Sequence, residues 1–155
     1  MDEAAYLARF RLPASYASLR LLRRRLLGFL ETSGYDAGPD GHDALALAVD
    51  EAAANIVRHG YAVPPDAPSG EAPGHIDVEL AVVAGELRVR LWDDGAPQSP
   101  EEFRTLPPRT PGESGMGLEI MRQIMTELRF ERTADERNLL EMRRRPGASD
   151  WSEEA

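Results

Sequence analysis

A chain of 155 residues with 42% hydrophobic and 29% charged residues has the size and composition of a single globular domain. Its 18 basic residues are all arginine and stand against 27 acidic ones, so the net charge of -9 opposes a nucleic-acid-binding role, and the absence of lysine excludes the Walker P-loop and Schiff-base catalysis. There is no cysteine, which excludes disulfides, thiolate zinc sites and cysteine nucleophiles.

The sequence also bears on where the protein works. No apolar run approaches the roughly 20 residues that a membrane-spanning helix needs. The N-terminus, Met1 to Ala4, is acidic and lacks the basic region and apolar stretch of a secretory signal. We therefore expect a cytoplasmic protein that binds neither membranes nor nucleic acid.

The first half of the sequence predicts one strand and two helices. In chain order these are a strand over 8–12, a helix over 15–32 and a helix over 43–59. Apolar and polar residues alternate in the strand, which Pro13 ends, and apolar residues recur at helical spacing in both helices. Ser15 is placed to cap the first helix, and Gly34 and Gly60 are placed to stop the first and second helix.

The second half predicts four strands and one helix. In chain order we expect a Pro/Gly-rich loop over 62–74, a hairpin of strands 75–83 and 86–92, a loop or lid over about 94–116, a helix over 117–128 and strands over 129–133 and 138–143. The whole order predicts an α/β (α+β) two-layer sandwich, in which helices cover one face of a mostly antiparallel sheet. We expect this single domain to span 1–145, and residues 146–155 to form a disordered polar tail.

Two polar residues of the second predicted helix form a first candidate site. Glu51 and Asn55 are four residues apart, so their side chains leave the same helix face about one turn apart. The oxygen of an Asn amide is a neutral ligand suited to Mg²⁺, and a carboxylate one turn away can accept a proton from a hydroxyl. Taken alone, such a pair is more often part of an ordinary solvated helix face.

A second candidate follows the strand over 86–92. Asp93 and Asp94 come directly after it, and Gly95 permits a tight turn there, so a carboxylate is placed at the end of the strand. Such an aspartate can accept a hydrogen bond from the exocyclic amine of adenine. An ordinary Asp-Gly turn is the alternative interpretation.

A third candidate precedes the helix over 117–128. Residues 112–117 read Gly-Glu-Ser-Gly-Met-Gly, and backbone N–H groups at a helix N-terminus can bind a phosphate without lysine. A flexible hinge is the alternative interpretation of these glycines. The three candidates nevertheless occur in the order that one nucleotide site requires: a metal ligand, a residue that recognises the base, and a phosphate loop.

In these residues the chain resembles the histidine-kinase-like ATPases of the Bergerat or GHKL type. Within that superfamily it is most similar to the bacterial anti-sigma-factor serine/threonine kinases. The resemblance covers residues 8 to about 143 and depends on three motifs, which are DEAAANIVRHGY over 50–61, DDGAP over 93–97 and SGMGL over 114–118.

The resemblance implies ATP and Mg²⁺ as cofactors. It implies that Asn55 holds the Mg²⁺, that Glu51 is the base for a serine or threonine hydroxyl, and that Asp93 accepts the hydrogen bond of the adenine amine. The residues implied to contact ATP are Asn55, Asp93, Gly95, Gly115, Met116, Gly117 and Leu118.

The implied function is that of an anti-sigma factor and kinase, which phosphorylates an anti-anti-sigma (antagonist) protein, sequesters a sigma factor and forms a homodimer. A second hypothesis is a non-catalytic ATP-binding or partner-binding regulatory module of the same fold. Two departures from the family pattern motivate it, namely Ala96-Pro97 in the turn and Glu113 where relatives can place an arginine. Arg137-Asn138 stands where Gly-Thr is common, so the sequence assigns no base contact there.

Overall fold

The computed structural model describes residues 4–39, 41–66, 72–97 and 117–147. Its elements in chain order are β1 (Ala4–Pro13), α1 (Ser18–Ser33), α2 (Gly41–Asn55), the π-helix η1 (Ile56–Gly60), β2 (His75–Val83), β3 (Glu86–Asp93), α4 (Gly117–Ile124), β4 (Glu127–Arg132) and β5 (Asn138–Arg144). The predicted succession of strands and helices is therefore confirmed.

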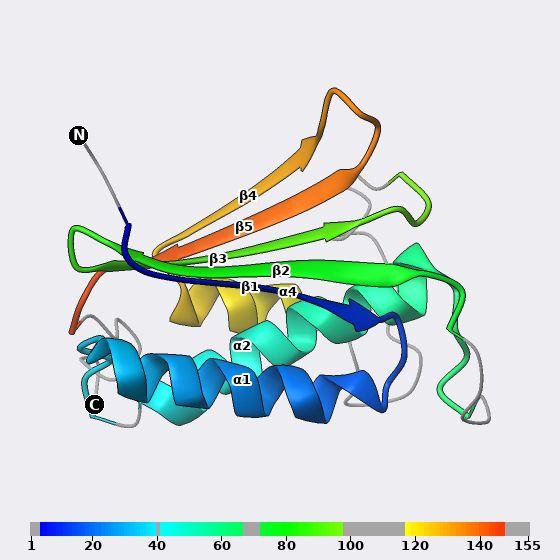
Figure 1. Ribbon diagram of the computed structural model, residues 1–155. Coiled ribbons are helices and arrows are strands. Elements are labelled where there is room, and N and C mark those ends of the chain that lie inside the picture. Colours follow the sequence, from blue (N-terminus) through cyan, green and yellow to red (C-terminus); the bar gives the residue numbers. More distant parts are fainter. Residues whose placement is uncertain (1–3, 40, 67–71, 98–116, 148–155) are drawn as a thin grey trace.

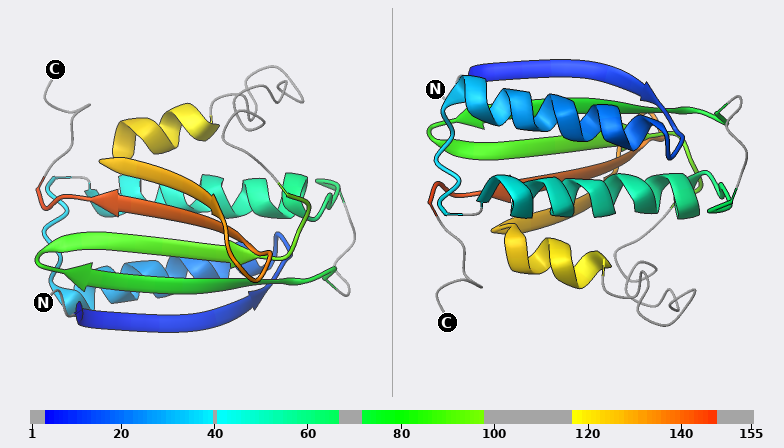
Figure 2. Two further views of the ribbon diagram at one scale, coloured as in Figure 1. Left: turned by 90° about the horizontal axis from the view of Figure 1, so that it is seen from above. Right: turned by 90° about the horizontal axis from the view of Figure 1, so that it is seen from below.

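The five strands form one sheet in the order β1-β2-β3-β5-β4, and each neighbouring pair is antiparallel. The helices α1, α2 and α4 all lie on one face of this sheet (Figure 1). Seen from below, α2 lies between α1 and α4 (Figure 2) and contacts both. The predicted two-layer α+β sandwich, with an antiparallel sheet and helices on one face, is confirmed.

Residue alternation in β3 determines where the polar end of this strand lies. Leu87, Val89 and Leu91 are fully buried and belong to the core between sheet and helices. Since successive side chains of a strand point to opposite faces, Asp93 is the next member of the same row and is itself buried. The end of β3 thus presents a carboxylate on the helix side of the sheet.

The opposite face of the sheet carries paired charges. Arg90 donates to Oε1 of Glu79 at 3.3 Å and to Oε2 of Glu141 at 2.6 Å, while Arg9 and Arg143 donate to the other oxygens of these two carboxylates. Burial acts to raise the pKa of Glu141, but the hydrogen bonds from Arg90 and Arg143 hold it below its ordinary value. Both glutamates are therefore buried with two arginine partners each.

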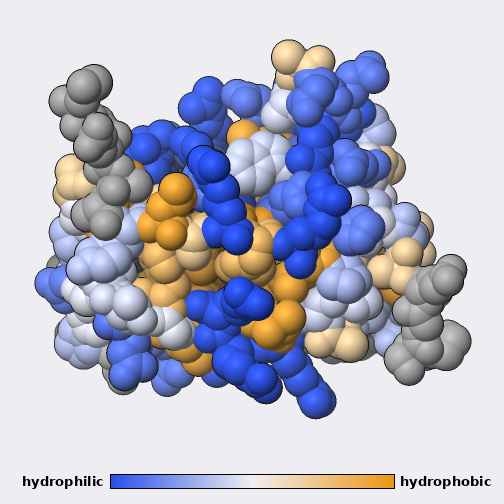
Figure 3. Space-filling model, in the orientation of Figure 1, coloured by the Kyte–Doolittle hydropathy of each residue, from blue (hydrophilic) through white to orange (hydrophobic). Residues whose placement is uncertain are grey.

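One edge of the molecule, formed by β1 and α1, shows an apolar area bordered by hydrophilic side chains (Figure 3). Ala8 and Phe10 of β1 and Leu19 of α1 are partly buried hydrophobic residues packed against the core. The guanidinium of Arg25 lies 5.1 Å from the centroid of the Phe10 ring, in cation–π geometry. This edge of the molecule is thus apolar with an arginine over it.

Ser15 does not cap α1 as predicted, because the helix begins at Ser18 rather than at residue 15 and its N-cap is Ala17, which makes no side-chain cap hydrogen bond. The amide of Ser18 donates to Oγ of Ser15 at 3.3 Å, in the turn before the helix. Gly34 ends α1 in the left-handed conformation with φ of 66°. None of the helices in the described ranges is long and apolar enough to cross a membrane.

Other element boundaries were predicted wrongly. β1 begins at Ala4 rather than at residue 8, because it pairs with β2 along the whole length of that strand. The helix predicted over 117–128 ends at Ile124, because Leu128 belongs to β4, where it pairs with Met142 of β5. The α-helix predicted over 43–59 ends at Asn55, and the π-helix η1 follows directly.

Candidate functional site

Asp93 is the best-defined polar residue at the end of β3. Its side chain is buried, and its Oδ1 accepts hydrogen bonds from the amide of Gly95 and from Nδ2 of Asn138, both at 2.9 Å. Burial raises the pKa of Asp93 above its ordinary value, while the hydrogen bonds from Asn138 and Gly95 oppose that rise. These two bonds fix the carboxylate and leave its second oxygen, Oδ2, outside them.

A small pocket with a volume of about 20 Å³, partly open to solvent, lies beside this carboxylate. Its polar lining residues are Asp93, Asn138 and Glu131. The apolar walls include Ile56, Phe130 and Leu140. Apolar walls around a few convergent polar groups are typical of small-molecule sites. The chemistry of this lining matches a flat heterocycle that donates a hydrogen bond to a carboxylate.

The turn after Asp93 packs against the end of the π-helix. A Cβ built on Gly95 would lie 2.6 Å from the carbonyl carbon of Gly60, and the amide of Ala96 donates to the carbonyl oxygen of Gly60 at 2.8 Å. A side chain at position 95 would clash with the backbone of Gly60, so a glycine is required there. This contact brings the end of the segment over 50–60 and the turn over 93–96 into one site.

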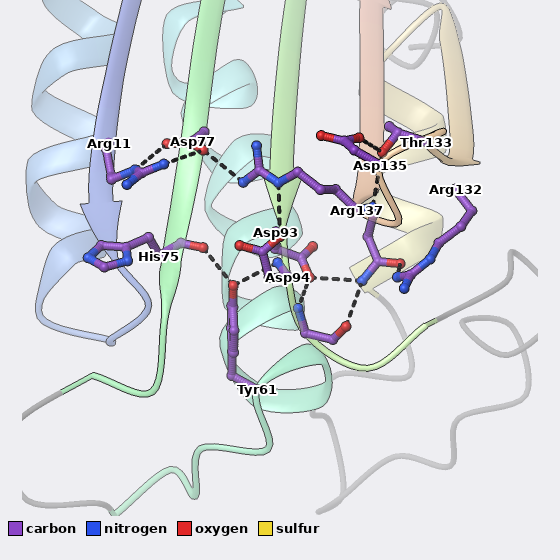
Figure 4. Close-up of polar contacts among 12 residues, drawn as sticks. Arg11, Tyr61, His75, Asp77, Asp93, Asp94, Arg132, Thr133, Asp135 and Arg137 are labelled. Atoms are coloured by element: carbon purple, nitrogen blue, oxygen red, sulfur yellow. Dashed lines mark hydrogen bonds and ion pairs between the residues drawn. The ribbon is translucent and has the colours of Figure 1, made fainter.

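Tyr61 connects this turn with the start of β2. Its hydroxyl donates to the carbonyl of His75 at 2.7 Å and accepts a hydrogen bond from the amide of Asp94 at 2.8 Å (Figure 4). Burial raises the pKa of the Tyr61 phenol above its ordinary value. The phenol therefore remains protonated and able to donate at neutral pH.

A chain of ion pairs holds Asp94 from the other side. Arg137 donates from Nε to Oδ1 of Asp94 at 2.9 Å and from Nη2 to Oδ2 of Asp77 at 2.7 Å, and Asp77 also accepts from Arg11 at 2.7 Å (Figure 4). The hydrogen bond from Arg11 and that from Arg137 lower the pKa of Asp77, although burial opposes them. Asp94 is thus held by Tyr61 through its backbone and by Arg137 through its carboxylate.

Glu51 and Asn55 lie on one α-helix, as the sequence predicts, with Asn55 as the last residue of α2. Asn55 is buried, and Glu51 is half-buried. Burial raises the pKa of Glu51, the charge of Asp50 raises it further, and Arg58 opposes the rise. A carboxylate with a raised pKa is a better proton acceptor at neutral pH than an exposed one.

Arg58 of the π-helix has an unsatisfied guanidinium. Its Nε and Nη1 are buried and have no hydrogen-bond partner, in the part of the chain that the structure describes. Buried N–H donors without an acceptor cost about 1–3 kcal/mol each, and more when the group is charged. The charge of Arg58 lowers the pKa of Glu51, so the guanidinium acts on that carboxyl. Its unused donors therefore lie within electrostatic reach of the helix end that carries Glu51 and Asn55.

The predicted phosphate loop lies mostly beyond the described ranges. Gly115 and Met116 fall outside them, as does most of the predicted lid. Gly117 is the first residue of α4, and Leu118 packs against the core. α4 in turn contacts α2, the helix that carries Glu51 and Asn55.

Sequence reasoning gave no role to Asn138, Arg137 or Arg58. One signal was available for Asn138, since residues 138, 140 and 142 alternate and place an amide in a row with Leu140 and Met142, which are buried. Asn138 is also the register partner of Asp93. A polar residue in an apolar row, opposite a carboxylate at a strand end, indicates that the two polar side chains interact.

Metal ligands were sought in the same region. Within residues 4–39, 41–66, 72–97 and 117–147 there is no group of three or more His, Cys, Asp or Glu side chains suited to hold a metal ion. The buried amide of Asn55 is the residue that the sequence singles out for Mg²⁺. Mg²⁺ is often bound by one or two protein ligands together with the phosphates of a substrate.

The chain is similar to known proteins over most of its length. The sequence profile of the histidine kinase-like ATPase domain matches residues 12–144. The chain is similar to the serine-protein kinase RsbW of Bacillus velezensis, with 28% identity over 129 residues that make up 78% of this chain and 75% of the relative. It is similar to the serine-protein kinase RsbW of Bacillus licheniformis as well, with 27% identity over 139 residues, or 84% of this chain and 81% of the relative.

Among solved structures, the chain is similar to the histidine kinase domain of a blue-light-activated histidine kinase, EL346, from Erythrobacter litoralis. The TM-score is 0.45 and the sequence identity is 21%. The match covers 85% of this chain and spans 60% of the solved chain.

Proposed function

The chain belongs to the histidine kinase-like ATPase family, and from that membership we propose that it is an anti-sigma factor and serine/threonine protein kinase. In this proposal it binds Mg-ATP, phosphorylates an anti-anti-sigma antagonist protein and sequesters a sigma factor. The similarity to two serine-protein kinases over most of their length supports the kinase activity. The observation that carries the proposal is the buried Asp93 carboxylate in the lining of a pocket with apolar walls.

The residues that line the pocket match the chemistry of the base of ATP. Asp93 offers Oδ2 as an acceptor for the adenine amine, and Ile56, Phe130 and Leu140 offer apolar surface to the ring. Gly95 contributes through Gly60, because their close packing holds the turn that follows Asp93.

The end of α2 fits the triphosphate. Arg58 has two buried donors without an acceptor among the described residues, which an anionic oxygen would satisfy. Asn55 would hold Mg²⁺ together with phosphate oxygens, and Gly115, Met116, Gly117 and Leu118 would form the phosphate loop before α4. Bound Mg-ATP supplies the transferable γ-phosphoryl group and most of the charge neutralisation.

Glu51 is the proposed base for the hydroxyl of the protein substrate. Its half-buried position and raised pKa favour proton acceptance near neutral pH. Asp50, its neighbour in the chain, also has a pKa raised by burial, but Arg23 opposes that rise. The two carboxylates differ in their cationic neighbours, and only Glu51 is influenced by Arg58.

The proposal includes a cytoplasmic location and a homodimer. β1 is an edge strand of the sheet, and Leu7 in it is 51% exposed. An edge strand with an exposed apolar side chain is available for pairing with a second copy. We also propose that the ATPase domain spans 1–145, with a lid over about 94–116 and a polar tail over 146–155.

Thermal unfolding with and without Mg-ATP tests the nucleotide site, because a ligand that binds the native state alone raises the melting temperature. We expect a magnesium-dependent rise that the Asn55→Ala variant loses. Gln123→Ala, which removes an exposed amide of α4, should keep it. No rise at millimolar ATP would refute the kinase proposal.

Transfer is tested separately, with γ-labelled ATP and purified candidate antagonist proteins. Labelling that Glu51→Gln abolishes would support the kinase. Nucleotide binding without labelling of any antagonist would favour the non-catalytic regulatory module of the same fold.

A further inference from the structure

The side-chain amide of Asn138 contacts four groups at the site, and the proposed function gives this residue no role. Its Nδ2 shares its two hydrogens among three acceptors, which are Oδ1 of Asp93 at 2.9 Å, the carbonyl oxygen of Ala96 at 3.1 Å and that of Gly95 at 3.3 Å. Its Oδ1 accepts from Nη1 of Arg132 at 3.0 Å. One amide thus connects the end of β4 with the carboxylate at the end of β3 and with the turn after it.

These partners determine which way the amide points. The nitrogen faces three acceptors and the oxygen faces a cationic donor. The flipped amide would place its oxygen against the carboxylate of Asp93 and two carbonyls, and its N–H groups against Arg132. The orientation that donates to Asp93 is therefore the one that all four contacts favour.

The hydrogen bond that Asn138 donates to Asp93 matters, because Asp93 is buried and yet has to be ionised in order to recognise an amine. A carboxylate accepts a hydrogen bond from the 6-amino group of adenine and repels the 6-oxo oxygen of hypoxanthine or guanine. A protonated carboxyl group would donate to a 6-oxo oxygen instead, and the distinction between the two bases would be lost. A hydrogen bond donated to the charged form stabilises that form.

We propose that Asn138 is a positioning and specificity-determining residue, which holds Asp93 as an oriented carboxylate and thereby selects 6-aminopurine over 6-oxopurine nucleotides. This inference rests on the proposed nucleotide site. It assigns Arg132 a supporting role, because that side chain fixes the oxygen end of the Asn138 amide.

The surroundings of Asp93 agree with the need for such a donor. Burial and the charge of Asp94 raise the pKa of Asp93, whereas Asn138, the amide of Gly95 and the charge of Arg137 lower it. The phenol of Tyr61 also lies within electrostatic reach of Asp93. Loss of the Asn138 donor leaves one hydrogen bond and the Arg137 charge to oppose the burial.

The test compares the affinities of the purified chain for Mg-ATP and Mg-ITP by calorimetry, since inosine differs from adenosine by a 6-oxo group and the proton on N1. We expect the wild type to prefer ATP and Asn138→Ala to lower the ATP-to-ITP affinity ratio about tenfold, as for loss of one hydrogen bond to a charged group. As the pH is lowered, the preference of this variant should disappear at a higher pH than that of the wild type, because loss of the donor raises the pKa of Asp93 further.

A double-mutant cycle separates positioning from a merely structural role. In the Asp93→Asn background the ratio should already be low, and adding Asn138→Ala should not change it. Should Asn138→Ala fail to fold, Asn138→Leu keeps a branched side chain of similar shape, removes the donor and is expected to lower the ratio in the same way.

Two negative results are distinguishable. If the wild type binds neither nucleotide, the proposed function and this inference both fail. If the wild type prefers ATP, Asp93→Asn removes the preference, and the Asn138 variants keep the wild-type ratio and pH dependence, only the inference is overturned.

Discussion

The backbone of Gly95 lies directly against the backbone of Gly60, and the carbonyl oxygen of Gly60 accepts a hydrogen bond from the amide of Ala96 at 2.8 Å. This contact joins the two parts of the chain that are proposed to read the base and to hold the metal. Because backbone faces backbone on both sides, neither segment has a flexible side chain that can make room.

We expect Gly95→Ala to destabilise the protein by about 1–3 kcal/mol, as for other overpacked positions. The added Cβ would lie 2.6 Å from the carbonyl carbon of Gly60, so the turn after Asp93 must shift. Urea unfolding measures the loss, and the affinity for Mg-ATP should fall with it.

Gly28→Ala is the matched control. Gly28 lies inside α1, and a Cβ built there meets no atom within 4 Å. Since glycine inside a helix is less favourable than alanine, this variant should gain about 0.5–1 kcal/mol. Equal effects of the two substitutions would contradict the role given to the Gly60 contact.

Removal of the Tyr61 hydroxyl should loosen the turn that holds Asp93. Tyr61→Phe loses the bond donated to His75 at 2.7 Å and the bond accepted from Asp94 at 2.8 Å, each worth about 1 kcal/mol. We expect lower stability and weaker Mg-ATP binding. Tyr16→Phe loses one bond, to the carbonyl of Val63 at 2.8 Å, and should lower stability with unchanged nucleotide affinity.

The fold was predictable because it depends on periodicity and on turn residues. Alternation over 75–92 predicted the hairpin of β2 and β3, and Gly34 marked the end of α1. The π-helix at Ile56–Gly60 was not predictable. The spacing of apolar residues does not distinguish an α-helix from a single π-helical turn, whose hydrogen bonds join residues five apart. The start of β1 at Ala4 was missed because it depends on the length of its partner strand.

The candidate site was predictable in part, for a similar reason. Short motifs identify residues that are close in the sequence, and Glu51, Asn55 and Asp93 were singled out as candidates in this way. The contact of Asn138 with Asp93 spans 45 positions, and that of Arg137 with Asp77 spans 60. Such contacts depend on sheet register and strand order, which the alternation of a single strand does not specify.

A pH-dependent effect on stability should distinguish Glu51. The pKa of Glu51 is about 4.3 in the unfolded chain and higher in the folded chain. The folded protein therefore loses stability as the pH rises from the unfolded pKa through the folded pKa. Glu51→Gln should therefore be more stable than the wild type at neutral pH, and the difference should vanish below about pH 4. Unfolding curves over this range measure it.

Asp50→Asn is the control for chemistry rather than for stability. Burial raises the pKa of Asp50 too, so this variant should show a gain at neutral pH of the same sign. Phosphoryl transfer should be lost in Glu51→Gln alone. Transfer that survives in Glu51→Gln, or that is lost equally in both variants, would exclude Glu51 as the base.

Arg58 should have opposite effects on the free and the nucleotide-bound protein. Two of its guanidinium nitrogens are buried without an acceptor among the described residues, so Arg58→Gln removes an unfavourable burial and should leave the free protein as stable or more stable. If phosphate oxygens satisfy these donors, the same variant should show a smaller rise in melting temperature with Mg-ATP. Arg122→Gln, on the exposed surface of α4, should change neither quantity. A variant that destabilises the free protein and keeps the full Mg-ATP effect would instead make Arg58 a structural residue.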